Sequence, residues 1–173
     1  MPKTKEYIFF LEKALQNANV KAFLWMIRKC EGTSAKDGYL YLFGSSPRNT
    51  RRFKRFDTHP KIPYEFKVGT KTQRTDAAGA YQFLGSTYDD LVKTLGVKDF
   101  KPYTQDLMAA ELISQRNCLQ ILMNGGFMVA LKKCATTWAS LPDAPYGQPV
   151  HTLEKCIQWY KEAGGTVMEV ASN

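Results

Sequence analysis

The sequence has no long hydrophobic run, and this absence excludes several classes of protein. The longest apolar stretch, Ala22 to Ile27, is far shorter than the roughly 20 residues that a transmembrane helix needs. It is also too short for the core of a signal peptide, and the N-terminal residues "MPKTKEYIFF" contain no small-residue cleavage site. We therefore expect a chain without an integral membrane segment that is made and folded in a cytoplasm. If it acts elsewhere, another protein must provide the way out.

Histidines are few and closely spaced cysteines are missing, which argues against a metal centre. His59 and His151 stand apart from thiols and acids, and no C-x-x-C pair occurs. We interpret the widely spaced cysteines as small core residues in a reducing compartment: Cys30, Cys118, Cys134 and Cys156. We therefore expect no metal, no cofactor and no disulfide bond.

What is present is an ordinary globular composition with a marked excess of positive charge. The 173 residues suffice for one domain with a substantial core, and 44% of them are hydrophobic. The net charge of +8 favours an anionic partner such as nucleic acid, a lipid surface or an acidic polymer. Solubility alone is the alternative explanation. Nothing in the sequence indicates an oligomer, so we expect a monomer.

Apolar residues recur at helical spacing in several segments. The first has Thr4 as a candidate N-cap, and the second ends at Gly32. A third begins with a capping-box pattern of Ser86 and Asp89. The predicted helices span residues 5–17, 20–30, 86–95, 104–122, 127–138 and 153–160, the last closed by two glycines.

Between these helices, residues 34–75 are rich in aromatic, basic, glycine and proline residues, which indicates short strands and turns. The best strand candidate there is "YLYLF", residues 39–43. The fold class predicted is therefore α+β and mainly helical, one domain over residues 1–173. Residues 1–19 would add an N-terminal helix, and residues 34–75 would form a small β-containing lobe with a cleft beside it.

The predicted helix over residues 20–30 is followed by an acid, Glu31. The partial negative charge of a helix C-terminus disfavours an ionised carboxylate there by about 0.3 to 1 kcal/mol. Burial against Trp25 or Met26 would disfavour it further, and both effects raise the pKa of the carboxyl group. A general acid needs such a pKa to remain protonated near neutral pH. The alternative is a surface residue at a frayed helix end.

Six stretches of the sequence together resemble one known family. They are "KAFLWMIRKCEGT" from Lys21, "FDTHPK" from Phe56, "DAAGAYQFL" from Asp76, "LGVKDFKPYTQD" from Leu95, "WASLPDAPYGQ" from Trp138 and "YKEAGGTV" from Tyr160. In this order they resemble blocks of the lambda-type phage endolysins, lytic transglycosylases of tailed phages that cleave peptidoglycan. The resemblance covers residue 20 to the end of the chain.

The resemblance implies a lysozyme-like two-lobed fold with an active-site cleft and a catalytic glutamate at Glu31. The bond cleaved would be the β-1,4 link between N-acetylmuramic acid and N-acetylglucosamine in peptidoglycan glycan strands. The muramic 6-hydroxyl would close onto the anomeric carbon to give a 1,6-anhydro end; a hydrolytic muramidase of the same fold is the alternative. An enzyme of this kind would reach the cell wall through a holin-type membrane pore and lyse the host.

A hydrolase would usually need a second carboxylate. Asp57 in "FDTHP" is the best candidate, because the β-containing lobe should face Glu31. Its other interpretation is a turn residue before Pro60. Thr33 would hydrogen-bond beside Glu31 or help to end the helix.

Four further residues are candidates for substrate binding. Tyr81 and Gln82 offer a ring for stacking on sugar and an amide for an N-acetyl group, or else they begin a packed helix. Tyr146 and Gln148 flank a glycine in a proline-rich loop, where aromatic side chains often line a groove. Trp138, in contrast, is expected in the core.

The alternative from another functional class is a nucleic-acid-binding protein. The segment "SPRNTRRFKRF", residues 46–56, interleaves basic residues with Phe53 and Phe56, as a phosphate-binding and base-stacking surface would. No known reading helix or RNA motif accompanies it, so we expect no specific nucleic-acid partner. The same charge could draw an enzyme to an anionic cell envelope, or the segment could be a solvated loop.

Overall fold

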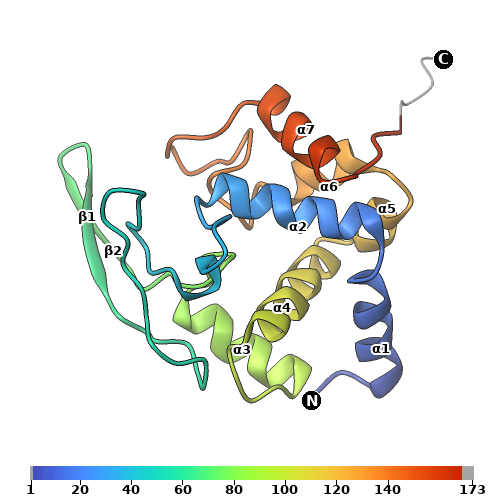
Figure 1. Ribbon diagram of the computed structural model, residues 1–173, viewed down its shortest axis with the longest axis horizontal. Helices are drawn as coiled ribbons and strands as arrows, with labels where there is room; N and C mark the ends of the chain where they lie inside the picture. The colour runs from blue at the N-terminus through green and yellow to red at the C-terminus, as the bar shows by residue number, and fades with distance from the viewer. Residues whose placement is uncertain (1, 169–173) are drawn as a thin grey trace.

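A computed structural model describes residues 2–168; residue 1 and residues 169–173 of the expected domain lie outside the described part. Helices form most of the regular secondary structure in the described residues, and a two-stranded hairpin extends from one side (Figure 1). This confirms the α+β, mainly helical class. The helices are α1 (Lys5–Ala14), α2 (Ala18–Cys30), α3 (Gly85–Leu95), α4 (Pro102–Gln115), α5 (Leu119–Met123), α6 (Phe127–Cys134) and α7 (Leu153–Glu162).

Helix α2 runs through the middle of the helical part and contacts α4, α5 and α7. It begins where the Asn17 side chain accepts hydrogen bonds from the backbone N–H groups of Asn19 and Val20. Most of its side chains are buried, among them Phe23 and Met26 with no exposed surface. Each large apolar side chain buried in this way contributes about 1.5 to 3 kcal/mol. The C-terminal end of α2 is thereby held firmly at the edge of the core.

Helix α1 packs against α4, and the predicted Thr4 cap accepts the backbone N–H of Tyr7. The Tyr7 hydroxyl donates to Oε2 of the fully buried Glu111 at 2.7 Å. The helix therefore belongs to the core of the fold.

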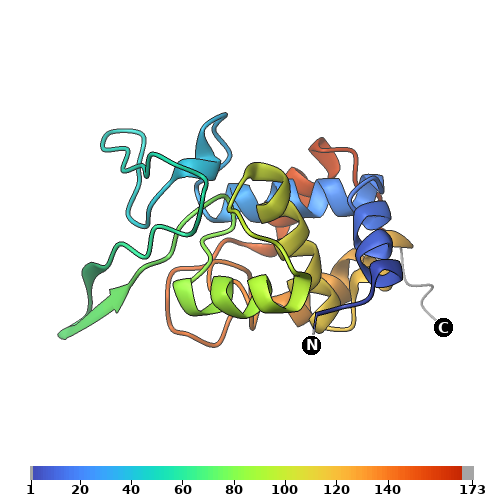
Figure 2. The same ribbon diagram turned by 90° about the horizontal axis from the view of Figure 1, so that it is seen from below.

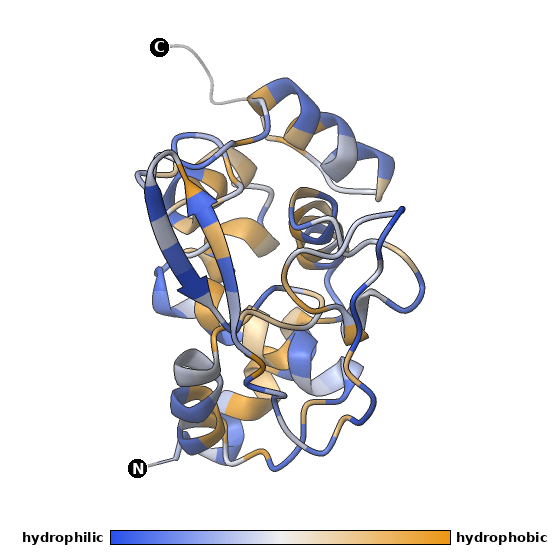
Figure 3. Cartoon of the chain, turned by 90° about the vertical axis from the view of Figure 1, so that its left-hand side faces the viewer, coloured by the Kyte–Doolittle hydropathy of each residue, from blue (hydrophilic) through white to orange (hydrophobic). Residues whose placement is uncertain are grey.

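The small lobe has one hairpin, β1 (Tyr64–Val68) paired antiparallel with β2 (Lys71–Thr75), which projects away from the helices (Figure 2). Strand β2 is mostly hydrophilic (Figure 3). The strand predicted at residues 39–43 is wrong. A short 3-10 helix, Gly38–Leu40, replaces its start, and Tyr41 and Leu42 make single bridges to two different segments, so no ladder can extend.

Two of the helix predictions are wrong in their bounds, and a third is wrong in its N-terminal cap. The segment 104–122 is divided between α4 and α5, because Asn117 adopts a left-handed conformation with φ of 52°. Helix α6 ends at Cys134, so Trp138 lies beyond it, although Trp138 is buried as expected. The capping box at the start of α3 does not form; Asp76 accepts the Gly85 N–H instead.

The cysteines are free and buried, and they lie in two pairs. The Sγ atoms of Cys30 and Cys156 are 3.7 Å apart, as are those of Cys118 and Cys134. Within residues 2–168, no helix has the length and apolar character needed to cross a membrane.

Candidate active site

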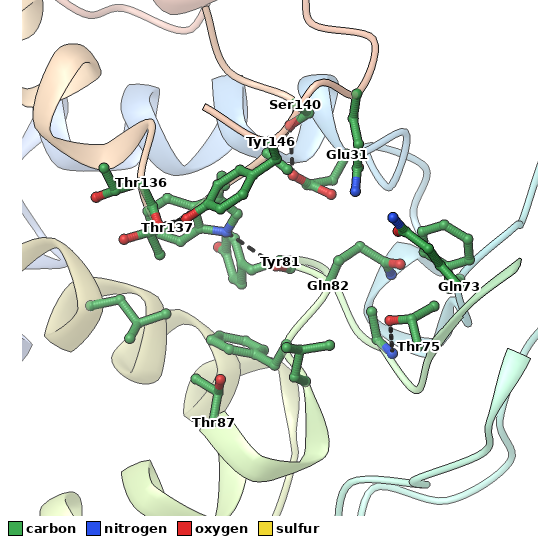
Figure 4. A pocket seen from close by; sticks show the side chains of 18 of the residues that line it. Glu31, Gln73, Thr75, Tyr81, Gln82, Thr87, Thr136, Thr137, Ser140 and Tyr146 are labelled. Atoms are coloured by element: carbon green, nitrogen blue, oxygen red, sulfur yellow. Dashed lines mark hydrogen bonds between the residues drawn. The ribbon is translucent and has the colours of Figure 1, made fainter. Parts of the chain in front are cut away.

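A cleft of about 560 Å³ lies between the helical part and the hairpin. Its walls come from the end of α2, the inner face of the hairpin, the loop before α3, the end of α4 and the segment after α6 (Figure 4). Hydroxyl and amide side chains line it beside aromatic rings, including Gln73, Thr75, Thr87, Thr136 and Thr137. Such a surface can make many hydrogen bonds to a hydroxyl-rich ligand.

Glu31 lies in this cleft as the C-terminal cap of α2. The Ser140 hydroxyl donates a hydrogen bond to its Oε1 at 2.6 Å (Figure 4). The residue is partly exposed at the cleft, but desolvation by the surrounding protein dominates its titration and raises its pKa to about 7. The Ser140 bond acts in the opposite direction and lowers the pKa. Near neutral pH the carboxyl group can therefore both give and take a proton.

His151 holds the two sides of this pair together. Its backbone N–H donates to the Ser140 carbonyl at 3.0 Å. Its Nε2 makes a 3.1 Å hydrogen bond to the carbonyl of Cys30, the residue before Glu31. Because one residue contacts both segments, the distance between the Ser140 hydroxyl and the Glu31 carboxyl group is constrained.

Thr33 is buried just after Glu31 and does not line the main cleft. Its hydroxyl donates to the Ala80 carbonyl at 2.5 Å, which ties the end of α2 to the loop that carries Tyr81. It does line a smaller cavity of about 100 Å³, together with Glu31 and Gln82. Its contacts are those of a residue that positions the loop.

Tyr81 and Gln82 both line the cleft, but they differ in exposure. Tyr81 is only 2% exposed, and its hydroxyl donates to Oδ1 of Asp106 at 2.5 Å. Gln82 is half-buried with φ of 50°, a conformation that an L-residue rarely adopts. Its side chain Nε2 donates to the Gly79 carbonyl at 2.9 Å. Strained backbone of this kind is concentrated at functional sites.

Tyr146 and Gln148 also line the cleft. Figure 4 shows Tyr146 near Ser140 and Glu31. Tyr146 is 51% exposed, and its hydroxyl donates to the Thr136 carbonyl at 2.6 Å. Its ring is therefore fixed at one end and open to the cleft.

Asp57 is the one sequence candidate that the structure places outside both cavities. Its carboxylate pairs with Arg55 at 2.6 Å, and its side chain is 67% exposed. Among residues 2–168, Glu31 is the only carboxylate that lines either cavity. No group of three potential metal ligands occurs in this described part.

Sequence reasoning missed Ser140, Gln73 and the two threonines, Thr136 and Thr137. Ser140 lies within the block "WASLPDAPYGQ", yet only the tertiary fold brings it to Glu31, 109 positions earlier. Gln73 belongs to a strand that the sequence pattern did not predict.

The chain is similar to endolysins of two phages of Escherichia. The chain is 36% identical to the endolysin of Escherichia phage lambda over 160 residues, 89% of this chain and 96% of that protein. It is 33% identical to the endolysin of Escherichia phage P2 over 154 residues, 85% and 93% of the two chains. The structure of bacteriophage lambda lysozyme complexed with a chitohexasaccharide matches with a TM-score of 0.77 and 35% identity, covering 88% of this chain and 97% of that one. The endolysin family profile matches residues 21–167, and the chain belongs to the endolysin family.

Proposed function

We propose that this endolysin degrades peptidoglycan by cleaving the β-1,4 bond between N-acetylmuramic acid and N-acetylglucosamine, as a lytic transglycosylase. The observation that carries the proposal is the Glu31 carboxyl group, which lines a cleft, is half-buried there and has its pKa raised to about 7 by desolvation. The related lambda lysozyme was solved with a chitohexasaccharide, which supports a glycan in this cleft.

Glu31 is the proton donor of the proposed reaction. It transfers its proton to the glycosidic oxygen as the bond from that oxygen to the anomeric carbon of the muramic residue breaks. The muramic 6-hydroxyl then bonds to the anomeric carbon and gives its proton to the Glu31 carboxylate. The products are a 1,6-anhydromuramic end and a free 4-hydroxyl, and Glu31 is again protonated. Ser140 stabilises the carboxylate between the two proton transfers.

The presence of a single carboxylate, Glu31, among the described residues that line the cleft favours this reaction over hydrolysis. Retaining hydrolases place a second carboxyl group about 5 to 5.5 Å from the acid, and inverting ones about 6.5 to 9.5 Å. Glu31 has no such partner among the described residues that line the cleft. In the transglycosylase reaction the same glutamate serves as acid and then as base. The alternative is a hydrolytic muramidase, which would give reducing muramic ends instead of 1,6-anhydro ends.

The composition of the digest tests the mechanism. Purified peptidoglycan treated with this protein should release muropeptides that end in anhydromuramic acid, lighter by one water than reducing ends. Mass spectrometry of the soluble fraction measures this directly, with a hydrolytic lysozyme digest as the reference. Reducing ends alone would reject the transglycosylase mechanism and leave the muramidase.

The nucleic-acid alternative has less support, because several of the residues on which it depends already make contacts within the protein. Arg52 pairs with Asp37, and Arg55 pairs with Asp57, each at 2.6 Å. Phe53 is 5% exposed within the core, so its ring is not free to stack on a base. The remaining positive charge is consistent with attraction to an anionic envelope, which the enzyme would meet after release through a membrane pore.

A further inference from the structure

Three aromatic side chains of the small lobe, Phe43, Tyr64 and Phe66, form a cluster separate from the main core. The ring centroids of Phe43 and Phe66 are 4.8 Å apart, and those of Phe43 and Tyr64 are 5.7 Å apart. All three are only half-buried. None belongs to the core cluster or to the partly buried residues packed against it. Their burial therefore contributes little to the helical core.

Two members of this cluster, Phe43 and Phe66, line the cleft. Phe43 lines both the main cleft and the small cavity beside it, and Glu31 and Gln82 line the same two spaces. Phe66 pairs with Gln73 in the hairpin, so their side chains share the inner face, and both line the cleft. Gln73 reaches into the cleft on the hairpin side of Glu31 and Gln82 (Figure 4).

Arg51 holds this aromatic surface in place from behind. Its Nη1 donates to the Phe43 carbonyl at 2.6 Å, and its guanidinium group lies 4.3 Å from the Tyr64 ring centroid. Its own carbonyl accepts the Ser45 hydroxyl at 2.6 Å. A surface fixed in this way loses little conformational freedom when a ligand binds.

We propose that Phe43 and Phe66 form an aromatic subsite that stacks against one pyranose ring of the glycan, on the hairpin side of Glu31. A pyranose has an apolar face of C–H groups and a polar rim. Aromatic rings bury the first, while Gln73 and Thr75 beside them offer hydrogen bonds to the second. This subsite rests on the proposed function, because it needs a glycan strand in the cleft.

The test uses Glu31→Gln protein, so that the ligand is not cleaved, and measures chitohexaose affinity by calorimetry. Adding Phe66→Ala should weaken binding about tenfold, the loss typical of a well-buried contact residue. Phe66→Tyr keeps the ring and should remain within about twofold of the parent. Val68→Ala is the matched control, because Val68 lies on the same strand face but does not line the cleft.

Phe66→Leu distinguishes stacking of the Phe66 ring on a sugar from packing of its side chain that supports the hairpin. Leucine can still pack on Phe43, but it has no ring face for a sugar. Affinity several-fold below the parent supports the subsite; full recovery with leucine, or unchanged affinity with alanine, overturns it. If the subsite is overturned in either of these two ways, the proposed function still holds as long as the Glu31→Gln protein binds chitohexaose and the wild type gives anhydro products. Absence of any chitohexaose binding by the Glu31→Gln parent overturns the subsite, and the muropeptide digest of the wild type then decides the proposed function separately.

Discussion

Replacing Glu31 with glutamine should reduce lysis of peptidoglycan about 1000-fold or more while leaving the fold intact. General acid–base catalysis accelerates a reaction by about 10²- to 10⁴-fold. In the proposed reaction Glu31 acts first as the acid and then as the base. Glutamine has nearly the same shape and can still accept the Ser140 hydrogen bond, so the structural disturbance is small. The rate of turbidity loss of a purified cell-wall suspension measures the effect.

Asp57→Asn is the matched control for this variant. It also converts an acid to its amide, but at an exposed side chain outside both cavities. We expect its activity to stay within about twofold of the wild type, since exposed ion pairs contribute little. Folding of both variants is checked by circular dichroism. Undiminished lysis by correctly folded Glu31→Gln would remove Glu31 from the proposed chemistry.

The same Glu31→Gln change should stabilise the protein at alkaline pH. In the folded state burial raises the pKa of Glu31 from 4.5 to about 7, so the folded protein binds a proton that the unfolded chain releases between these values. Stability is therefore lost as pH rises from about 4.5 to about 7, and the loss is complete above that range. The 2.5-unit difference corresponds to about 3 kcal/mol at 1.36 kcal/mol per unit.

Thermal unfolding of wild type and variant at pH 4 and pH 8 measures this difference. At pH 8 the variant should melt roughly 6 to 12 °C higher than the wild type, because about 1 kcal/mol shifts the midpoint by 2 to 4 °C in a domain of this size. At pH 4 the carboxyl group is protonated in both states, and the two proteins should melt within about 2 °C of each other. A difference that is the same at both pH values would mean that ionisation of Glu31 is not its cause.

Local patterns in the sequence predicted the helical part of the fold well. The apolar spacing after Thr4 and the dense run before Gly32 correspond to α1 and α2, because their hydrophobic faces are buried as the period requires. The prediction at residues 39–43 failed because Tyr41 and Leu42 pair with two different segments, at Arg52 and at Ala78. Strand propensity cannot reveal which partners the tertiary fold supplies.

The candidate site was predictable only in part, for a similar reason. Glu31 could be identified by its place at a helix end and by the resemblance of the surrounding block. Ser140, which contacts it, comes from a segment more than 100 positions away, and no local pattern predicts that approach. Asp57 was chosen from its expected lobe, but its ion pair with Arg55 lies outside the cleft. Distances between distant segments are properties of the fold as a whole.

The proposed chemistry depends on a Glu31 carboxyl group that keeps its proton near neutral pH because the protein around the end of α2 desolvates it. The most direct test is a ¹³C NMR titration of that carboxyl carbon in the unliganded wild-type protein, assigned by comparison with Glu31→Gln. We predict a midpoint at about pH 7. A midpoint near 4.5, the ordinary value for glutamate, would contradict it.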